Sequence, residues 1–271
     1  GDFISWYEEW KITADRVKSQ ADLWEKQGHL ISARDAYLKA SSYYRTSSFY
    51  MDAPENRDKS ILMNKQSKIC LLKAIKHMPY IKPVHIPYEN TTLPGYFIHS
   101  GKKSGKSPVV IIQTGFDGTG EELCIQFAKT VKARGYHCLI FEGPGQGSVL
   151  REQKLYFRPD WQKVVTPMVD WLVRRPDVDT NKIALIGISF GGYLAPKAVT
   201  EEHRIKACIA NGGVYDMSLN FTTKMPESIL KLLDTDPKNF DSIILQAAQN
   251  NTTLRWNLYH GQWAFGVDTP S

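Results

Sequence analysis

The chain contains no long apolar run. No stretch approaches the roughly 18 uninterrupted apolar residues of a membrane-spanning helix. The first ten residues, GDFISWYEEW, lack the basic-then-apolar order of a secretory signal peptide. The sequence therefore predicts a cytoplasmic protein that does not interact with membranes.

Cysteine is scarce as well, and no metal-binding motif is present. The four cysteines are far apart in the sequence, at Cys70, Cys124, Cys138 and Cys208, and no CxxC or HExxH spacing occurs. Three of them fall in segments with the pattern of buried strands or helices. We therefore expect four free thiols, no bound metal and no cofactor.

The charge shows no concentration of one sign. Lys and Arg total 34 against 28 Asp and Glu, which gives a formal net charge of +6 and a pI near 9.0. The basic residues are scattered among acidic ones and form no continuous run. This pattern favours a solvated basic surface over a nucleic-acid-binding site.

The first 78 residues contain almost no Gly or Pro. Apolar residues recur at helical spacing, and this pattern predicts an all-helical N-terminal domain over residues 1–78. Gly28 is suited to end the first helix and Ser32 to cap the start of the second. A third helix is predicted from just after Pro54 to about His77.

From residue 79 onward, short apolar runs alternate with helical patterns. The β-branched, almost wholly apolar runs separated by helices are typical of a parallel sheet covered on both faces. Residues 79–271 are thus predicted to form a three-layer α/β sandwich with a mostly parallel sheet, and residues 217–265 to form cap helices. The predicted strands are 84–88, 96–99, 109–113, 137–141, 183–186 and 207–210, and the helices are 121–134, 161–174 and 193–201.

One motif indicates chemistry. The hexapeptide GISFGG at residues 187–192 follows the apolar strand KIALI and precedes a helix. In such a G-x-S-x-G elbow, glycines allow a turn so sharp that the serine oxygen is exposed above the sheet. We predict that Ser189 is a nucleophile aimed at the positive end of the next helix. The alternative is a strand-to-helix turn without catalytic function.

A serine nucleophile also needs two N–H groups that stabilise the oxyanion of the tetrahedral intermediate. We assign these to Phe190, which follows the nucleophile, and to the backbone of Phe116, in the glycine-rich loop 113–120. That loop could also serve only as a tight strand-to-helix connection. The next loop, EGPGQG at 142–147, lacks the Lys-Ser/Thr ending of a phosphate loop and is predicted to be a tight turn beside the site.

These segments resemble a known family. PVHIPYENTTLPGYFI, QTGFDGTGEE, FEGPGQG and DTNKIALIGISFGGYLAPKA are similar to the α/β-hydrolases related to prolyl oligopeptidase and acylaminoacyl peptidase. The resemblance is closer to the branch with a helical N-terminal domain, which includes 2,6-dihydroxypseudooxynicotine hydrolase, fungal polyketide-shortening hydrolases and FrsA-like esterases. It implies a Ser-Asp-His triad and a cap over the site.

The resemblance also implies a substrate class. It points to an ester, an amide or a carbon–carbon bond next to a carbonyl, in a small molecule or a short peptide. In such proteins a carboxylate just after the oxyanion loop can face the pocket, and Glu121 matches that position. Glu121 is equally explained as an acid in the first turn of a helix, where the helix dipole favours it.

The sequence departs from this family where the triad base is expected. Fewer than a third of the residues follow Ser189, and two of them are histidines, His203 and His260. His203 is predicted to lie at the surface. His260 is a candidate base, or else lines or packs the pocket with Tyr259 and Trp263. We expect the triad Asp and His beyond residue 271, with the C-terminal part of the hydrolase fold missing.

The predicted function is hydrolysis through an acyl-enzyme on Ser189. The alternative is an inert hydrolase fold in which the helical N-terminal domain recruits a partner. We also predict that the N-terminal helices and residues 217–265 jointly roof the pocket, because both are rich in aromatic residues. The oligomeric state is left open, a homodimer included.

Overall fold

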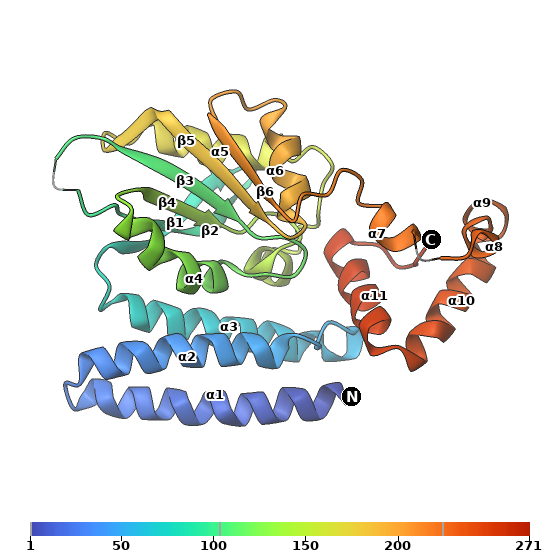
Figure 1. Ribbon diagram of the computed structural model, residues 1–271. Helices are drawn as coiled ribbons and strands as arrows, with labels where there is room; N and C mark the ends of the chain where they lie inside the picture. The colour runs from blue at the N-terminus through green and yellow to red at the C-terminus, as the bar shows by residue number, and fades with distance from the viewer. Residues whose placement is uncertain (1, 103, 224) are drawn as a thin grey trace.

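The computed structural model describes residues 2–102, 104–223 and 225–271, and its centre is a six-stranded sheet in the order β1-β2-β4-β3-β5-β6 (Figure 1). Strands β4, β3, β5 and β6 are parallel to one another, as the sequence predicted, while β2 runs antiparallel to both β1 and β4. The strands are β1 (Ile81–Tyr88), β2 (Thr91–Ile98), β3 (Ser107–Gln113), β4 (His137–Phe141), β5 (Val178–Ile188) and β6 (Ala207–Asn211).

At the centre of the sheet, both faces of β3 and β4 are buried because successive apolar residues point to opposite sides, whereas the edge strand β6 is exposed at every residue. In β3, Val109 and Ile111 pack on one face against α5 (Gln162–Val173) and α6 (Gly191–Val199). Val110 and Ile112 pack on the other face against α4 (Gly120–Ala133). The result is the predicted three-layer α/β sandwich.

The N-terminal segment forms a helical layer of three helices, α1 (Phe3–Lys26), α2 (Leu30–Ser48) and α3 (Arg57–Ile75). Figure 1 shows this layer on the α4 side of the sheet. Gly28 has φ +80° just after the first helix, as expected of a helix-ending glycine. Ser32 does not cap the second helix, because that helix already begins at Leu30.

The helical layer shares a core with the sheet. Leu71 and Ile75 of α3 belong to the same buried apolar cluster as Ile98 of β2 and Val110 of β3. Figure 1 also shows the C-terminal helices grouped at one end of the molecule. These helices are α7 (Leu219–Thr222), α8 (Glu227–Leu230), α9 (Leu232–Thr235), α10 (Pro237–Asn250) and α11 (Thr252–Phe265).

The state of the cysteines agrees with the prediction. The four cysteines are free thiols; Cys208 is exposed and the other three are buried. Among the described residues, no helix combines the length and the apolar character needed to cross a bilayer.

Candidate active site

Ser189 lies in the sharp turn between β5 and α6. Its φ is +58°, a left-handed conformation that non-glycine residues rarely adopt. The Ser189 N–H donates to the Asn211 carbonyl at 2.8 Å, and the Ser189 carbonyl accepts from the Gly192 N–H at 2.8 Å. A Cβ on Gly187 would stand 1.8 Å from the Gly191 carbonyl oxygen. Only glycine at 187 permits this turn, and Ser189 is exposed at its tip.

The glycine-rich loop after β3 packs directly on this turn. A Cβ on Gly115 would be 2.6 Å from the Phe190 nitrogen and 3.0 Å from the Ser189 Cβ. Phe116 follows in the chain and lines the same cavity as Ser189 and Phe190. Within the described residues, neither the Phe116 nor the Phe190 N–H donates a hydrogen bond to another group of the protein. Both predicted oxyanion donors therefore border the serine.

Ser189 opens into a cavity of about 860 Å³. Apart from the elbow and the Phe116 loop, its walls come from residues 212–257, most of which belong to the predicted cap segment 217–265. Most of the lining is apolar, including Val214, Met217, Ile229, Ile244, Leu254 and Trp256. Such a lining suits an apolar substrate.

The prediction that the N-terminal helices jointly roof this cavity is wrong. Of the described residues that line it, none comes from the helical layer. The layer supports the cap from outside instead: the Trp256 Nε1 donates to the Phe49 carbonyl at 2.9 Å, and the two rings stack at 4.9 Å. The aromatic N-terminal residues pack mainly among their own helices, as in the Trp10–Tyr43 pair.

His260 is buried, and its hydrogen bonds argue against a role as the base. Its Nδ1 is 2.9 Å from the Asp52 carboxylate, and its Nε2 is 2.9 Å from the Phe116 carbonyl oxygen. A carbonyl can only accept, so Nε2 donates and has no lone pair for the Ser189 proton. The packing interpretation of His260 fits, and its ring also contacts Phe116 edge-on.

Asp52 is the partner that sequence reasoning missed. It lies between α2 and α3 and is 3% exposed. Burial alone would raise the pKa of Asp52, but the facing His260 and Arg151 hold it below its ordinary value. Its Oδ1 also accepts from the Ser60 hydroxyl at 3.0 Å. A buried ionic network thus joins the helical layer, α11 and the oxyanion loop.

The other predicted pocket residues lie outside the Ser189 cavity. Trp263 is buried and contacts two guanidinium groups, with Arg57 at 5.0 Å and Arg151 at 5.2 Å from its ring centre. Tyr259 is half-buried on α11. Neither contributes to the lining of the cavity at Ser189.

Glu121 lies in the first turn of α4 and lines a different cavity, of about 160 Å³, together with Tyr96 and Glu142. The Tyr96 hydroxyl donates to Glu121 Oε1 at 2.6 Å. Burial and the nearby Glu142 charge raise the pKa of Glu121 to about 7. The carboxylate therefore does not face the Ser189 cavity.

Gln146, in the loop after β4, was not predicted as a site residue. The sequence placed its loop beside the site, and the structure brings the fully buried Gln146 side chain against the oxyanion loop. Its Nε2 donates to the carbonyls of Thr114 at 2.9 Å and Gly115 at 3.0 Å. The available signal was a long polar side chain in an otherwise glycine-rich turn.

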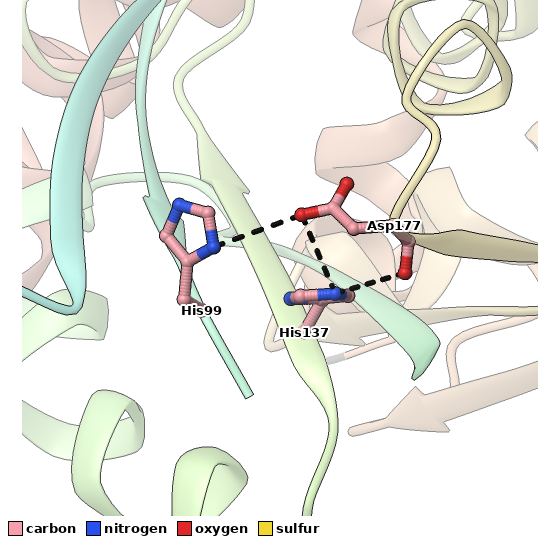
Figure 2. A group of neighbouring side chains, drawn as sticks. All are labelled: His99, His137 and Asp177. Atoms are coloured by element: carbon pink, nitrogen blue, oxygen red, sulfur yellow. Dashed lines mark hydrogen bonds and ion pairs between the residues drawn. The ribbon is translucent and has the colours of Figure 1, made fainter. Parts of the chain in front are cut away.

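A group of three possible metal ligands lies at the opposite, amino-terminal edge of the parallel strands (Figure 2). His99 and His137 both face Asp177, at 3.7 Å. The Ser100 N–H donates to His137 Nδ1, so the ring proton sits on Nε2, which donates to the Asp177 carbonyl at 3.1 Å. The Asp177 carboxylate is already paired with Arg175. The hydrogen bonds of the His137 ring and the pairing of Asp177 with Arg175 favour a hydrogen-bonded cluster over a metal site.

Comparison of the sequence with known protein families identifies the family of this chain. The family described as "Esterase FrsA-like" matches residues 4–256. The chain belongs to the FrsA-like esterase family. It is therefore an α/β-hydrolase, as the resemblance implied.

Relatives of this FrsA-like chain carry hydrolase names. It is 34% identical to the α/β hydrolase xenA of Xenoacremonium sinensis over 97% of this chain and 65% of the relative. It is 32% identical to the 20-hydroxy-prefusarin hydrolase FUS2 of Gibberella moniliformis over 100% of this chain and 67% of the relative. The chain thus spans about two thirds of the length of these relatives.

Solved structures agree on the fold of this FrsA-like chain. The crystal structure of the 2,6-dihydroxy-pseudo-oxynicotine hydrolase superposes with a TM-score of 0.72, at 24% identity, over 83% of this chain and 62% of that one. AbyA5 superposes with a TM-score of 0.61 at 16% identity, over 83% of this chain and 61% of that one. At these identities the likeness concerns the fold alone.

Proposed function

We propose that this protein hydrolyses an ester, an amide or a carbonyl-adjacent carbon–carbon bond of a small, largely apolar substrate through an acyl-enzyme on Ser189. The observation that carries the proposal is the left-handed φ of +58° at an exposed serine. Such strain persists only where the surrounding structure enforces it, and it concentrates at functional sites. The close approach of Gly115 and Gly191 to neighbouring backbone enforces it here.

The reaction has two steps. In the first, the Ser189 Oγ bonds to the substrate carbonyl carbon, its proton passes to a base, and the bond to the leaving group breaks as the tetrahedral intermediate collapses. The leaving group departs with a proton. In the second, water adds to the acyl carbon and releases a carboxylic acid and free Ser189.

During both steps, negative charge develops on the substrate oxygen. The Phe116 and Phe190 N–H groups border Ser189 and have no partner of their own among the described residues. We assign them to that oxygen, where each such donor is worth about 10²- to 10³-fold in kcat. The base is assigned to none of the described residues, because no histidine lines the cavity and His260 Nε2 is bonded to a carbonyl.

The substrate class follows from the cavity. Its volume of about 860 Å³ accommodates a drug-sized molecule, and its apolar walls favour a hydrocarbon-rich acyl or leaving group. The hydrolase names of the relatives, among them a 20-hydroxy-prefusarin hydrolase, support a small-molecule substrate. A short peptide with apolar side chains is the other substrate that fits.

Covalent labelling tests the proposal. A fluorophosphonate should label the full-length protein once, at Ser189, and Ser189→Ala should abolish labelling. Ser32→Ala, which alters an exposed serine of α2, is the matched control and should label like the native protein. A folded native protein that resists labelling would favour the inert binding module instead.

A further inference from the structure

The Gln146 side chain is held rigidly at both ends of its amide. Its Oε1 accepts from the Gly143 N–H at 2.9 Å, which fixes the orientation of the amide group. Its Nε2 then directs two protons at two acceptors, the carbonyls of Thr114 and Gly115. The side chain is fully buried, so water does not compete for these bonds.

One of these two bonds fixes the direction of the N–H that we assign to the oxyanion. The Gly115 carbonyl and the Phe116 N–H belong to the same peptide group. A trans peptide is planar, with its C=O and N–H pointing in opposite directions, and the described residues contain no cis peptide bond. Because the Gly115 carbonyl points into the interior at Gln146, the Phe116 N–H points away from Gln146.

The two residues that this peptide joins, Gly115 and Phe116, both lie next to the nucleophile. Gly115 lies against the turn so closely that a Cβ on it would be 3.0 Å from the Ser189 Cβ. Phe116 and Ser189 line one cavity, whereas Gln146 is not part of its lining.

We propose that Gln146 is a positioning residue of the oxyanion hole: it holds the Gly115–Phe116 peptide so that the Phe116 N–H faces the oxygen of the tetrahedral intermediate. The inference rests on the proposed function of Ser189. Rotation of this peptide changes ψ of residue 115, which glycine tolerates over a wide range, together with φ of Phe116. Without the Gln146 bond, the peptide can turn its carbonyl toward the developing negative charge, which repels that charge instead of stabilising it.

The neighbouring peptide has a separate restraint, so the effect of Gln146 is specific. The Phe116 carbonyl accepts from His260 Nε2 at 2.9 Å, on the far side of the residue. Loss of Gln146 therefore frees the 115–116 peptide while His260 still restrains the 116–117 peptide.

The experiment uses the full-length protein with Gln146→Met, which keeps the side-chain length and removes both donors. Gln146→Glu is the second variant, because its carboxylate retains the bond from the Gly143 N–H but places an oxygen against two carbonyls. Gln153→Met is the matched control: the Gln153 Nε2 also donates to a backbone carbonyl, that of Thr92, but at the surface.

On a p-nitrophenyl ester, both Gln146 variants should lose about 10- to 100-fold in kcat, with KM changed by less than about 3-fold. Inhibition by a trifluoromethyl ketone, whose adduct resembles the tetrahedral intermediate, should weaken in proportion to kcat/KM. Gln153→Met should match the native protein in both. An unchanged kcat, or a fall in kcat without weaker ketone binding, would overturn the proposal.

A crystal structure separates this proposal from the function itself. In native protein carrying a phosphonate on Ser189, the phosphonyl oxygen should lie about 3 Å from the Phe116 nitrogen, with the Gly115 carbonyl on Gln146. If native Ser189 takes no label, the proposed function fails. The orientation of the Gly115 carbonyl in a crystal of Gln146→Met then decides the present proposal, because an unrotated peptide contradicts it.

Discussion

Replacement of Glu121 by glutamine should stabilise the protein, although Glu121 is buried and hydrogen-bonded. The residue is 3% exposed, and its carboxyl group lies near Glu142, which already accepts hydrogen bonds from the N–H groups of Gly120 and Ser148. Burial and the Glu142 charge both disfavour a second negative charge at this place. Glutamine keeps an oxygen that accepts from the Tyr96 hydroxyl and cannot ionise.

The size of the effect follows from the pKa of Glu121, which rises from 4.5 to about 7 in the folded protein. Between these values the native state holds a proton that the unfolded state has lost, so the free energy of unfolding falls as pH increases. The full penalty, reached above pH 7, is about 3 kcal/mol. Below pH 4.5 Glu121 is protonated in both states and contributes no pH dependence.

Urea unfolding of native protein and Glu121→Gln between pH 4.5 and pH 8 measures this difference. We expect the two stabilities to diverge progressively with pH, with the variant more stable by up to about 3 kcal/mol at pH 8. Glu9→Gln, on the exposed surface of α1, is the control and should follow the native curve. Parallel native and Glu121→Gln curves over the whole range would refute the reasoning.

Three further predictions concern the elbow, the buried network and the cap. Gly187→Ala should abolish fluorophosphonate labelling or folding, because its Cβ would stand 1.8 Å from a carbonyl oxygen. Gly213→Ala is the control and should label normally, since its Cβ would have its nearest contact at 3.5 Å. His260→Asn should destabilise the fold by about 3 kcal/mol, because it removes the main partner of buried Asp52. The variant should still react with the fluorophosphonate within a few-fold of the native rate. Loss of labelling in the folded variant would indicate that His260 is the base. Trp256→Phe should lower the stability by about 1 kcal/mol in urea unfolding, through the lost bond to the helical layer, and an unchanged stability would show that this link contributes nothing.

The sequence predicted those features whose signal is local. The prediction for 137–141 matches β4 from end to end, because the strand is flanked by a helix-ending glycine and a glycine-rich loop. β5 begins at Val178, five residues before the predicted start, because Val178, which precedes the polar stretch 179–182, pairs with Ser107 of β3. Pairing between distant strands leaves no mark on such polar residues.

The same distinction applies to the site. The elbow around Ser189 is a contiguous motif and its backbone geometry is as expected. His260 bonds instead to Asp52, 208 residues away, and to Phe116, 144 residues away. Contacts over such separations cannot be inferred from a single sequence. The sequence therefore gave no sign that both ring nitrogens of His260 are hydrogen-bonded.

The core shared by α3 and the sheet has a consequence for how the molecule denatures. Since Leu71 and Ile75 are buried in one cluster with the strands, heat cannot melt the N-terminal helices first without exposing the underside of the sheet. The change in composition near residue 79 therefore does not divide two melting units. Calorimetry should record one transition whose van't Hoff and calorimetric enthalpies agree.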